Sequence, residues 1–534
     1  MVQLLAAIKP QIKSVKSRRE LRSAQIAGRA YPSEIPSESV ANRKPRIPVG
    51  SGRFVRILVC VSFLLLVVPA AARDYPPEVP PPKPFVIPVP RVRKLPNGLK
   101  VVSIERHALP LVTLRLVVMS GAEADPPGLA GTAQLVAGLL SQGTERRTAL
   151  EIADAVDSSG GLLDTGAAWD DSYVALTVLS DHTEQAYDLI ADMVLHPRFA
   201  RTELERQRKQ TLSALEVLYE DPSYLADTVF DRLIFAGTPY GHPADGTPQS
   251  VSQISQNDLR QFHALNYRPG NSILAVVGDV RSEEAFRLAG KFFDSWKAEP
   301  RKRDEVPSRS AATPRQRFVV IDKPDAVQTE IRAGNLAVRR ASDDYYALTV
   351  ANQVLGGPAA NRLFKALRTR SGLAYGASSD LVCYANTGSW VAKTSTRTSE
   401  TIRSLHLVLE EMNRLHDDRI SGAELRTAQS YLIGHLALEF ETSDDVAAQM
   451  LDLMVHKLAL NWWNSFPREV QMLRAEDISN VARRYLNPER SVLVLVGNAS
   501  AFRKELKRFG TPVIIPLQDL ASPDLERAAS AHAR

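Results

Sequence analysis

Asp258–Gly278 reads DLRQFHALNYRPGNSILAVVG, and Asp477–Gly497 reads DISNVARRYLNPERSVLVLVG. The two stretches align without a gap, so that Pro269 falls on Pro488. Each has the pattern of an amphipathic helix, a turn containing proline, and a strand of Val, Ile and Leu that ends at glycine. They lie 219 residues apart, which is far too long a period for a solenoid and predicts a duplicated domain.

The segments around these copies suggest where each domain begins and ends. Segment 299–315 is charged, rich in Pro and Ser, and without apolar periodicity, as expected of a linker. We therefore expect one domain over 94–298, a second over 316–510, and a tail over 511–534. Both domains open with strands and then alternate long helices with further strands. This pattern predicts an α+β fold of two tandem homologous sandwich domains, each a mixed or antiparallel sheet covered by helices.

The net charge of the chain is unevenly distributed. Residues 1–56 carry twelve Lys and Arg against three Asp and Glu, a net charge of +9. The remaining chain has 54 basic and 57 acidic residues, a net charge of about −3. The pI near 9.1 therefore reflects this leader, and the composition argues against a nucleic-acid partner. The leader is either disordered or an over-long start to the reading frame.

An export signal is predicted after the leader. Segment 57–72 contains an apolar run and ends in Ala70-Ala71-Ala72, a small-residue cleavage site. The run is shorter than the ~20 residues that a membrane-spanning helix needs, so we expect no stable span after cleavage. Segment 73–93 is a proline-rich linker. Cleavage would leave Cys383 as the only cysteine of an exported, periplasmic or extracellular protein, whose stability must come from core burial.

A second informative stretch, GLAGTAQLVAGLLSQGT, spans 128–144. Its apolar residues follow the period of a buried helix, and it contains no histidine.

Several stretches together resemble the pitrilysin/insulinase superfamily of zinc peptidases, which includes mitochondrial processing peptidase and core subunits of respiratory complex III. The stretches are LPNGLKVV (95–102), HALPLVTLRLVVMSGAEAD (107–125), GLA…GT (128–144), LHPRF (195–199), ELERQRKQTLSALEVLYEDP (203–222) and LGGPAANRLFKALRTRSGLAYG (355–376). The resemblance covers about 94–510 and implies two domains that form half of a clamshell. It is strongest to the short bacterial type, which pairs a zinc-bearing chain with a zinc-less one.

The resemblance also implies where zinc would bind in active members, at a His-x-x-Glu-His motif on the helix within 128–144. The motif falls on either 131–135 or 134–138, and neither register offers a ligand. The third ligand of the family matches Glu216 approximately, but one carboxylate does not hold zinc by itself. No two histidines lie four residues apart in the chain. We therefore expect no metal in this chain, and zinc on a partner subunit.

An arginine and a tyrosine match the family's second active-site element, at Arg368 and Tyr375 in LRTRSGLAY. The resemblance implies that these side chains project toward substrate at the zinc, where both donate hydrogen bonds to the scissile carbonyl and its oxyanion. Arg370 lies five residues from Tyr375 and fits the spacing less well. The alternative is structural: Arg368 pairs with a surface carboxylate and Tyr375 packs under the sheet.

GLLDTGAA, at 161–168, resembles the family's strand beside the catalytic helix, whose edge receives substrate as an added strand. On this basis the predicted substrate-binding residues are Leu162, Leu163, Asp164 and Thr165.

Three functions follow as hypotheses. The first is a zinc-less subunit that supplies Arg368 and Tyr375 to unfolded peptides bound at the zinc of a homologous partner, in a heterodimer. The second is a structural or peptide-binding subunit with no catalytic part. The third, an autonomous metallopeptidase, requires ligands that the sequence does not contain.

Overall fold

The computed structural model describes residues 86–297, 317–358 and 361–517. The predicted leader, the signal segment and the linker 299–315 lie outside the described residues. Within them, no helix combines the length and the apolar character needed to cross a membrane.

The first part of the described chain builds a six-stranded mixed sheet in the order β1-β2-β6-β3-β5-β4. β2 and β6 run parallel, and the other neighbours run antiparallel. The strands are β1 (Arg91–Lys94), β2 (Lys100–Glu105), β3 (Leu111–Val118), β4 (Leu162–Ala167), β5 (Ser172–Leu179) and β6 (Ser272–Gly278).

The second part builds another six-stranded mixed sheet, in the order β12-β7-β11-β8-β10-β9. Its strands are β7 (Arg317–Asp322), β8 (Gln328–Ala337), β9 (Ala374–Cys383), β10 (Gly388–Arg397), β11 (Val492–Gly497) and β12 (Val513–Pro516). Here β11 is parallel to β7 and antiparallel to β8, as β6 is to β2 and β3. β12 lies in the segment that was expected to be a tail, and it pairs with β7.

The sequence repeat corresponds to the same unit in both halves. Its first copy forms α9 (Gln256–Asn266), a short turn of 3-10 helix and β6, and its second copy forms α17 (Ala475–Tyr485), a similar turn and β11. Ser255 caps α9, where its side chain accepts from the Asp258 N–H. The predicted α+β fold with two mixed sheets covered by helices is confirmed.

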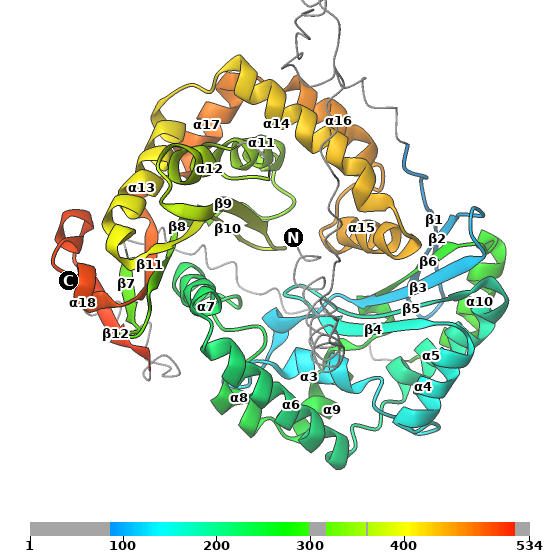
Figure 1. The fold of residues 1–534 in the computed structure, drawn as a ribbon. Coiled ribbons are helices and arrows are strands. Elements are labelled where there is room, and N and C mark those ends of the chain that lie inside the picture. Colours follow the sequence, from blue (N-terminus) through cyan, green and yellow to red (C-terminus); the bar gives the residue numbers. More distant parts are fainter. Residues whose placement is uncertain (1–85, 298–316, 359–360, 518–534) are drawn as a thin grey trace, which may run out of the picture. The chain divides into compact units, whose positions relative to one another are not determined.

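Helices cover both sheets (Figure 1). Those of the first half are α3 (Thr132–Leu139), α4 (Ala149–Ser158), α5 (Thr183–Leu195), α6 (Arg201–Tyr219), α7 (Pro222–Ile234), α8 (Pro248–Gln253), α9 and α10 (Ser282–Phe293). Those of the second half are α11 (Tyr345–Leu355), α12 (Arg362–Phe364), α13 (Thr401–Asp417), α14 (Gly422–His435), α15 (Ser443–Val455), α16 (Trp462–Met472), α17 and α18 (Ala499–Phe502).

Two helices are exchanged between the halves. α7 belongs to the first half in sequence but packs on β8 and β11 of the second sheet, and α15 of the second half packs on β3 and β6 of the first. The centre of each sheet is thereby covered on both faces, which is why the central strands β6 and β11 are buried at every residue and read as unbroken apolar runs.

The segment before β1 is bound to α16. Ile87 is 2% exposed, and its main-chain N–H and C=O both bond to the side-chain amide of Asn464, each at 2.9 Å. Four residues later the chain enters β1 at the edge of the first sheet. This short stretch therefore joins α16 of the second half to the first sheet.

Candidate functional site

The helix expected to carry a zinc motif is α3. Most of its residues are buried, and the two that are partly accessible are Gln134 and Gly138. These positions are four apart and so lie on one face of the helix. The sequence allows two registers for the His-x-x-Glu-His motif. In the register 134–138, the two positions that hold histidine in active members lie on the accessible face. Neither a glutamine nor a glycine is a ligand that holds zinc.

Gln134 is bonded to its surroundings. Its Oε1 accepts from the Ala167 N–H of β4 at 2.8 Å, and its Nε2 lies 3.4 Å from Oδ1 of Asp245. Gly138 faces the side chain of Gln207 on α6. Glu216, further along α6, is exposed. On this face α3 itself presents an amide and a glycine, and the carboxylate beside Gln134 is that of Asp245. Throughout the described ranges, no group of three or more His, Cys, Asp and Glu side chains is arranged to hold a metal ion.

β4, which contains the predicted substrate-binding residues, is an edge strand of the first sheet. At the hairpin that joins it to β5, the Ala168 N–H donates to the Asp171 carbonyl at 2.7 Å. Hydrogen-bonded pairs alternate along antiparallel strands, so the main-chain groups of Leu163 and Thr165 point away from β5. The bond from Ala167 to Gln134 fits this alternation. The free edge therefore offers main-chain groups at Leu163 and Thr165.

The side chains of β4 point to two different environments. Leu163 packs against the first hydrophobic core, whereas Leu162 is 76% exposed. Asp164 is exposed as well and accepts a bond of 2.8 Å from the Tyr173 hydroxyl. The guanidinium of Arg115 stacks on the Tyr173 ring, 4.1 Å from its centroid, and pairs with Asp444 of α15 at 3.0 Å. This network, which the sequence did not predict, links the edge strand to α15.

Arg368 lies in a π-helical turn, Lys365–Arg370, which follows α12. π-Helical turns are rare in proteins, and those that do occur are often found at functional sites. The turn ends at Gly372 with φ of +61°, a conformation that favours glycine. There the Gly372 N–H donates to the Arg368 carbonyl and the Leu373 N–H to the Leu367 carbonyl. The guanidinium carbon of Arg368 lies 4.7 Å from the Tyr375 ring centroid and 4.9 Å from that of Phe364.

Tyr375 lies in a β-bulge. Between the paired positions 374 and 377, β9 has one residue more than its partner β10 has between 394 and 396. Ala377 and Ser379 are buried, and the same alternation continued backward would bury position 375 as well. The extra residue instead turns the tyrosine outward, and it is 86% exposed. The structure thus differs from the alternative in which Tyr375 packs under the sheet.

Arg370, the other arginine near the predicted element, has a structural partner. It pairs with Glu411 of α13 at 2.9 Å, and Glu411 also pairs with Arg414 at 2.9 Å. The Glu411 side chain is 3% exposed. In the described part of the chain, Arg368 has no carboxylate within ion-pair distance, so its contacts are the two aromatic rings. The structure therefore brings Arg368 and Tyr375 together and directs Arg370 elsewhere.

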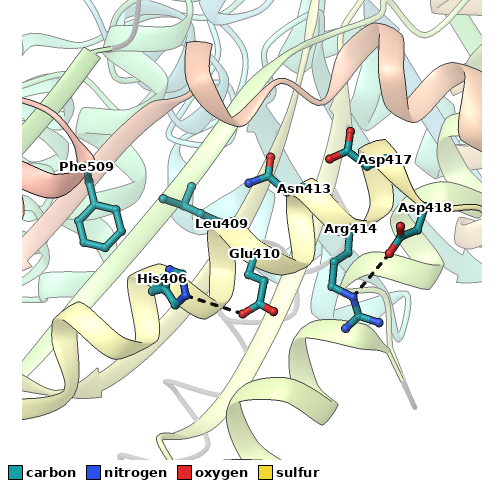
Figure 2. A pocket seen from close by; sticks show the side chains of 8 residues that line it. All are labelled: His406, Leu409, Glu410, Asn413, Arg414, Asp417, Asp418 and Phe509. Atoms are coloured by element: carbon teal, nitrogen blue, oxygen red, sulfur yellow. Dashed lines mark ion pairs between the residues drawn. The ribbon is translucent and has the colours of Figure 1, made fainter.

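A surface pocket lies along α13 (Figure 2). Two ion pairs lie among its lining residues, His406 with Glu410 and Arg414 with Asp418. No residue predicted for the site lines this pocket. It is therefore separate from the candidate site.

The family was tested by comparison with known proteins. Residues 100–244 match the family model described as insulinase (peptidase family M16), and residues 253–432 match the model described as peptidase M16 inactive domain. A protein of Mycobacterium bovis named uncharacterized zinc protease is 30% identical over 416 residues, which cover 76% of this chain and 93% of the relative. A non-peptidase homolog, YmxG of Helicobacter pylori, is 23% identical over 409 residues, covering 74% and 90%.

A solved structure agrees with these matches. The crystal structure of a peptidase M16 inactive domain from Pseudomonas fluorescens has a TM-score of 0.71 and 27% identity to this chain, covering 76% of it and 97% of the other chain. The resemblance stated from the sequence is thereby confirmed. This chain belongs to the insulinase (M16) peptidase family.

Proposed function

We propose that this chain is the zinc-less subunit of a two-chain metallopeptidase. A homologous partner supplies the zinc and the glutamate base, and this chain supplies Arg368 and Tyr375 to peptide bound at that zinc. The substrates are unfolded peptides, because only an extended chain can pair with a strand edge. The N-terminal segment exports the protein to the periplasm or the extracellular space.

The observation that carries this proposal is the placement of Arg368 and Tyr375. A π-helical turn and a β-bulge, both irregular, set a guanidinium and a phenol side by side, with the phenol turned outward. Both groups donate hydrogen bonds and suit a developing oxyanion. Irregular backbone of this kind is over-represented next to active sites.

The first half of the chain supports the proposal that the catalytic groups come from two different chains. On α3 the accessible positions of the motif are Gln134 and Gly138, so zinc would have to come from a second chain. The edge of β4 keeps main-chain groups that can pair with an extended peptide. The family also includes relatives named zinc protease and a relative named non-peptidase homolog.

One observation favours the second candidate function, a peptide-binding subunit without a catalytic part. Gln134 bonds to the Ala167 N–H, so its side chain occupies the end of the free edge of β4. A peptide could then pair with Leu163 and Thr165 and remain uncut.

The experiment is co-expression with an M16 chain that carries His-x-x-Glu-His, followed by a peptide-cleavage assay on the purified complex. We expect Tyr375→Phe to lower kcat by roughly a hundredfold, the order found when one oxyanion donor is removed. Tyr431→Phe is the matched control, since Tyr431 lies on α14 and stacks on His435. Unchanged hydrolysis by the Tyr375→Phe complex would refute the catalytic role. Peptide binding without cleavage would favour the second candidate.

A further inference from the structure

Two buried threonines lie behind the β-bulge. Thr394 and Thr396 are on β10, are 4% and 2% exposed, and point to the same face of the sheet. The Thr394 hydroxyl donates to the Gly376 carbonyl at 2.9 Å, and the Thr396 hydroxyl donates to the Leu373 carbonyl at 2.9 Å. The two bonds hold the backbone on both sides of Tyr375.

These two bonds satisfy backbone carbonyls beside the bulge. A bulge disrupts the ladder between two strands and leaves backbone groups without their regular partners. Valine has nearly the shape of threonine and would fill these buried positions without a polar atom. A buried hydroxyl is unfavourable unless it is hydrogen-bonded. Here both hydroxyls bond to carbonyls that flank the bulge, so they replace ladder bonds that the bulge removes.

A third hydroxyl fixes the direction of the bond from Thr396. Ser404 of α13 is fully buried, and its hydroxyl donates to Oγ1 of Thr396 at 2.9 Å. A threonine hydroxyl has a single proton, so Thr396 accepts from Ser404 and gives its own proton to the Leu373 carbonyl. The bonds thus run from α13 through β10 to Leu373, the residue that follows Gly372.

We propose that Thr394 and Thr396 are positioning residues, which hold the bulge in the one form that turns Tyr375 outward beside Arg368. What Tyr375 then does for hydrolysis rests on the proposed function. The positioning of Tyr375 by the two threonines does not rest on the proposed function. It can be measured on this chain alone.

The first test places 3-fluorotyrosine at position 375 of the full chain and records its ¹⁹F spectrum. We expect Thr394→Val and Thr396→Val to shift or broaden the resonance, and Thr396→Ser, which keeps the hydroxyl, to preserve it. Thr113→Val is the matched control: it removes the 2.8 Å hydrogen bond between the buried Thr113 hydroxyl and the partly buried Thr177 hydroxyl in the first sheet. Thr113→Val should leave the resonance unchanged, although it should lower the thermal stability about as much as the two valine variants of β10 do. A wild-type resonance in both valine variants of β10 would overturn the proposal.

The second test uses the complex with the zinc-bearing chain. We expect Thr396→Val to lower kcat on the order of tenfold with little change in KM, because small displacements of a positioned group cost rate. In the Tyr375→Phe background, Thr396→Val should cause no further loss, since it acts through the phenol. Additive losses would overturn the positioning role. If instead the ¹⁹F signal moves while Tyr375→Phe cleaves normally, the positioning role stands and the proposed function fails.

Discussion

Arg368 and Tyr375 depend on neighbours that hold their backbone. Thr394 and Thr396 fix the strand side, and the bond from Arg370 to Glu411 fixes the helix side. Arg368 itself is left with aromatic contacts. A guanidinium stacked on rings keeps its hydrogen-bond donors available, whereas the Arg370 guanidinium already donates to a carboxylate. This difference in contacts distinguishes Arg368 from Arg370 more clearly than their spacing to Tyr375 does.

Glu411→Gln tests the helix-side clamp. The change keeps the shape of the side chain but removes the charge that pairs with Arg370 and Arg414. Both arginines are partly exposed and can be rehydrated, so we expect a modest loss of about 1–2 kcal/mol in the free energy of unfolding. The measurement is urea unfolding of the full chain. Glu410→Gln, one residue earlier and exposed, is the control and should change stability by less than about 0.5 kcal/mol. Equal effects of the two variants would contradict the clamp.

The sequence predicted the pair of site residues but not their support. Arg368 and Tyr375 lie within one recognisable stretch. Leu373 and Arg370, in contrast, bond to Thr396 and Glu411, which lie 23 and 41 residues further along the chain. Nothing in a local pattern tells a threonine that stabilises a bulge from one that merely suits a strand. The run Lys393-Thr394-Ser395-Thr396 was the one available signal, because buried strand positions more often hold Val or Ile.

At the scale of elements, periodicity predicts that a face is buried but not what buries it. The apolar runs at β6 and β11 predicted strands, and the structure shows both to be buried and central. The π-helical turn and the bulge had no such signal, since each depends on one extra residue. The proline-rich segment was expected to be an extended linker. Its described end is fixed to α16 by Asn464, which the sequence did not predict.

Asn464→Ala tests this attachment. The change leaves the N–H and C=O of Ile87 without their partners, and an unsatisfied buried polar group costs about 1–3 kcal/mol. We expect faster hydrogen exchange at Ile87 and in the first residues of β1, measured by mass spectrometry on peptides from 86–100. Asn461→Ala is the control, since Asn461 precedes the same helix and its side chain does not cap it. Unchanged exchange in Asn464→Ala would show that burial of the Ile87 side chain suffices.

For the molecule as a whole, the repeat predicted two like sheets, and the exchange of α7 and α15 shows how they are joined. The repeat extends to this junction. Arg115 pairs with Ala275 across β3 and β6, and Arg332 pairs with Val494 across β8 and β11, so the two arginines occupy equivalent positions. Each bonds to an aspartate of the exchanged helix, Asp444 or Asp227. The sequence could not predict this, because the equivalence appears only when the strands are paired.

The junction also contains His456, at the end of α15. Its ring lies 3.1 Å from Asp452 and 3.6 Å from Asp170 of the β4–β5 turn, and Arg340 pairs with Asp452 at 3.6 Å. Burial alone would lower the pKa of His456, but the two aspartates raise it to about 10. A raised pKa means that the folded chain binds this proton more tightly than the unfolded chain, in which a histidine has a pKa of about 6.5.

The stabilisation from His456 is therefore complete below about pH 6.5 and is lost as the pH rises through about 10. We expect His456→Gln to reduce the free energy of unfolding by about 2 kcal/mol at pH 6 and by much less at pH 10, so that the variant depends less on pH over this range. Urea unfolding at pH 6, 8 and 10 measures it. His435→Gln is the control, because His435 is on α14 with its side chain 45% exposed. If the free energy of unfolding of His456→Gln depended on pH as steeply as that of the wild type, the proton on His456 would not hold α15 to the first sheet. The contact would then depend on the ion pair of Arg115 with Asp444.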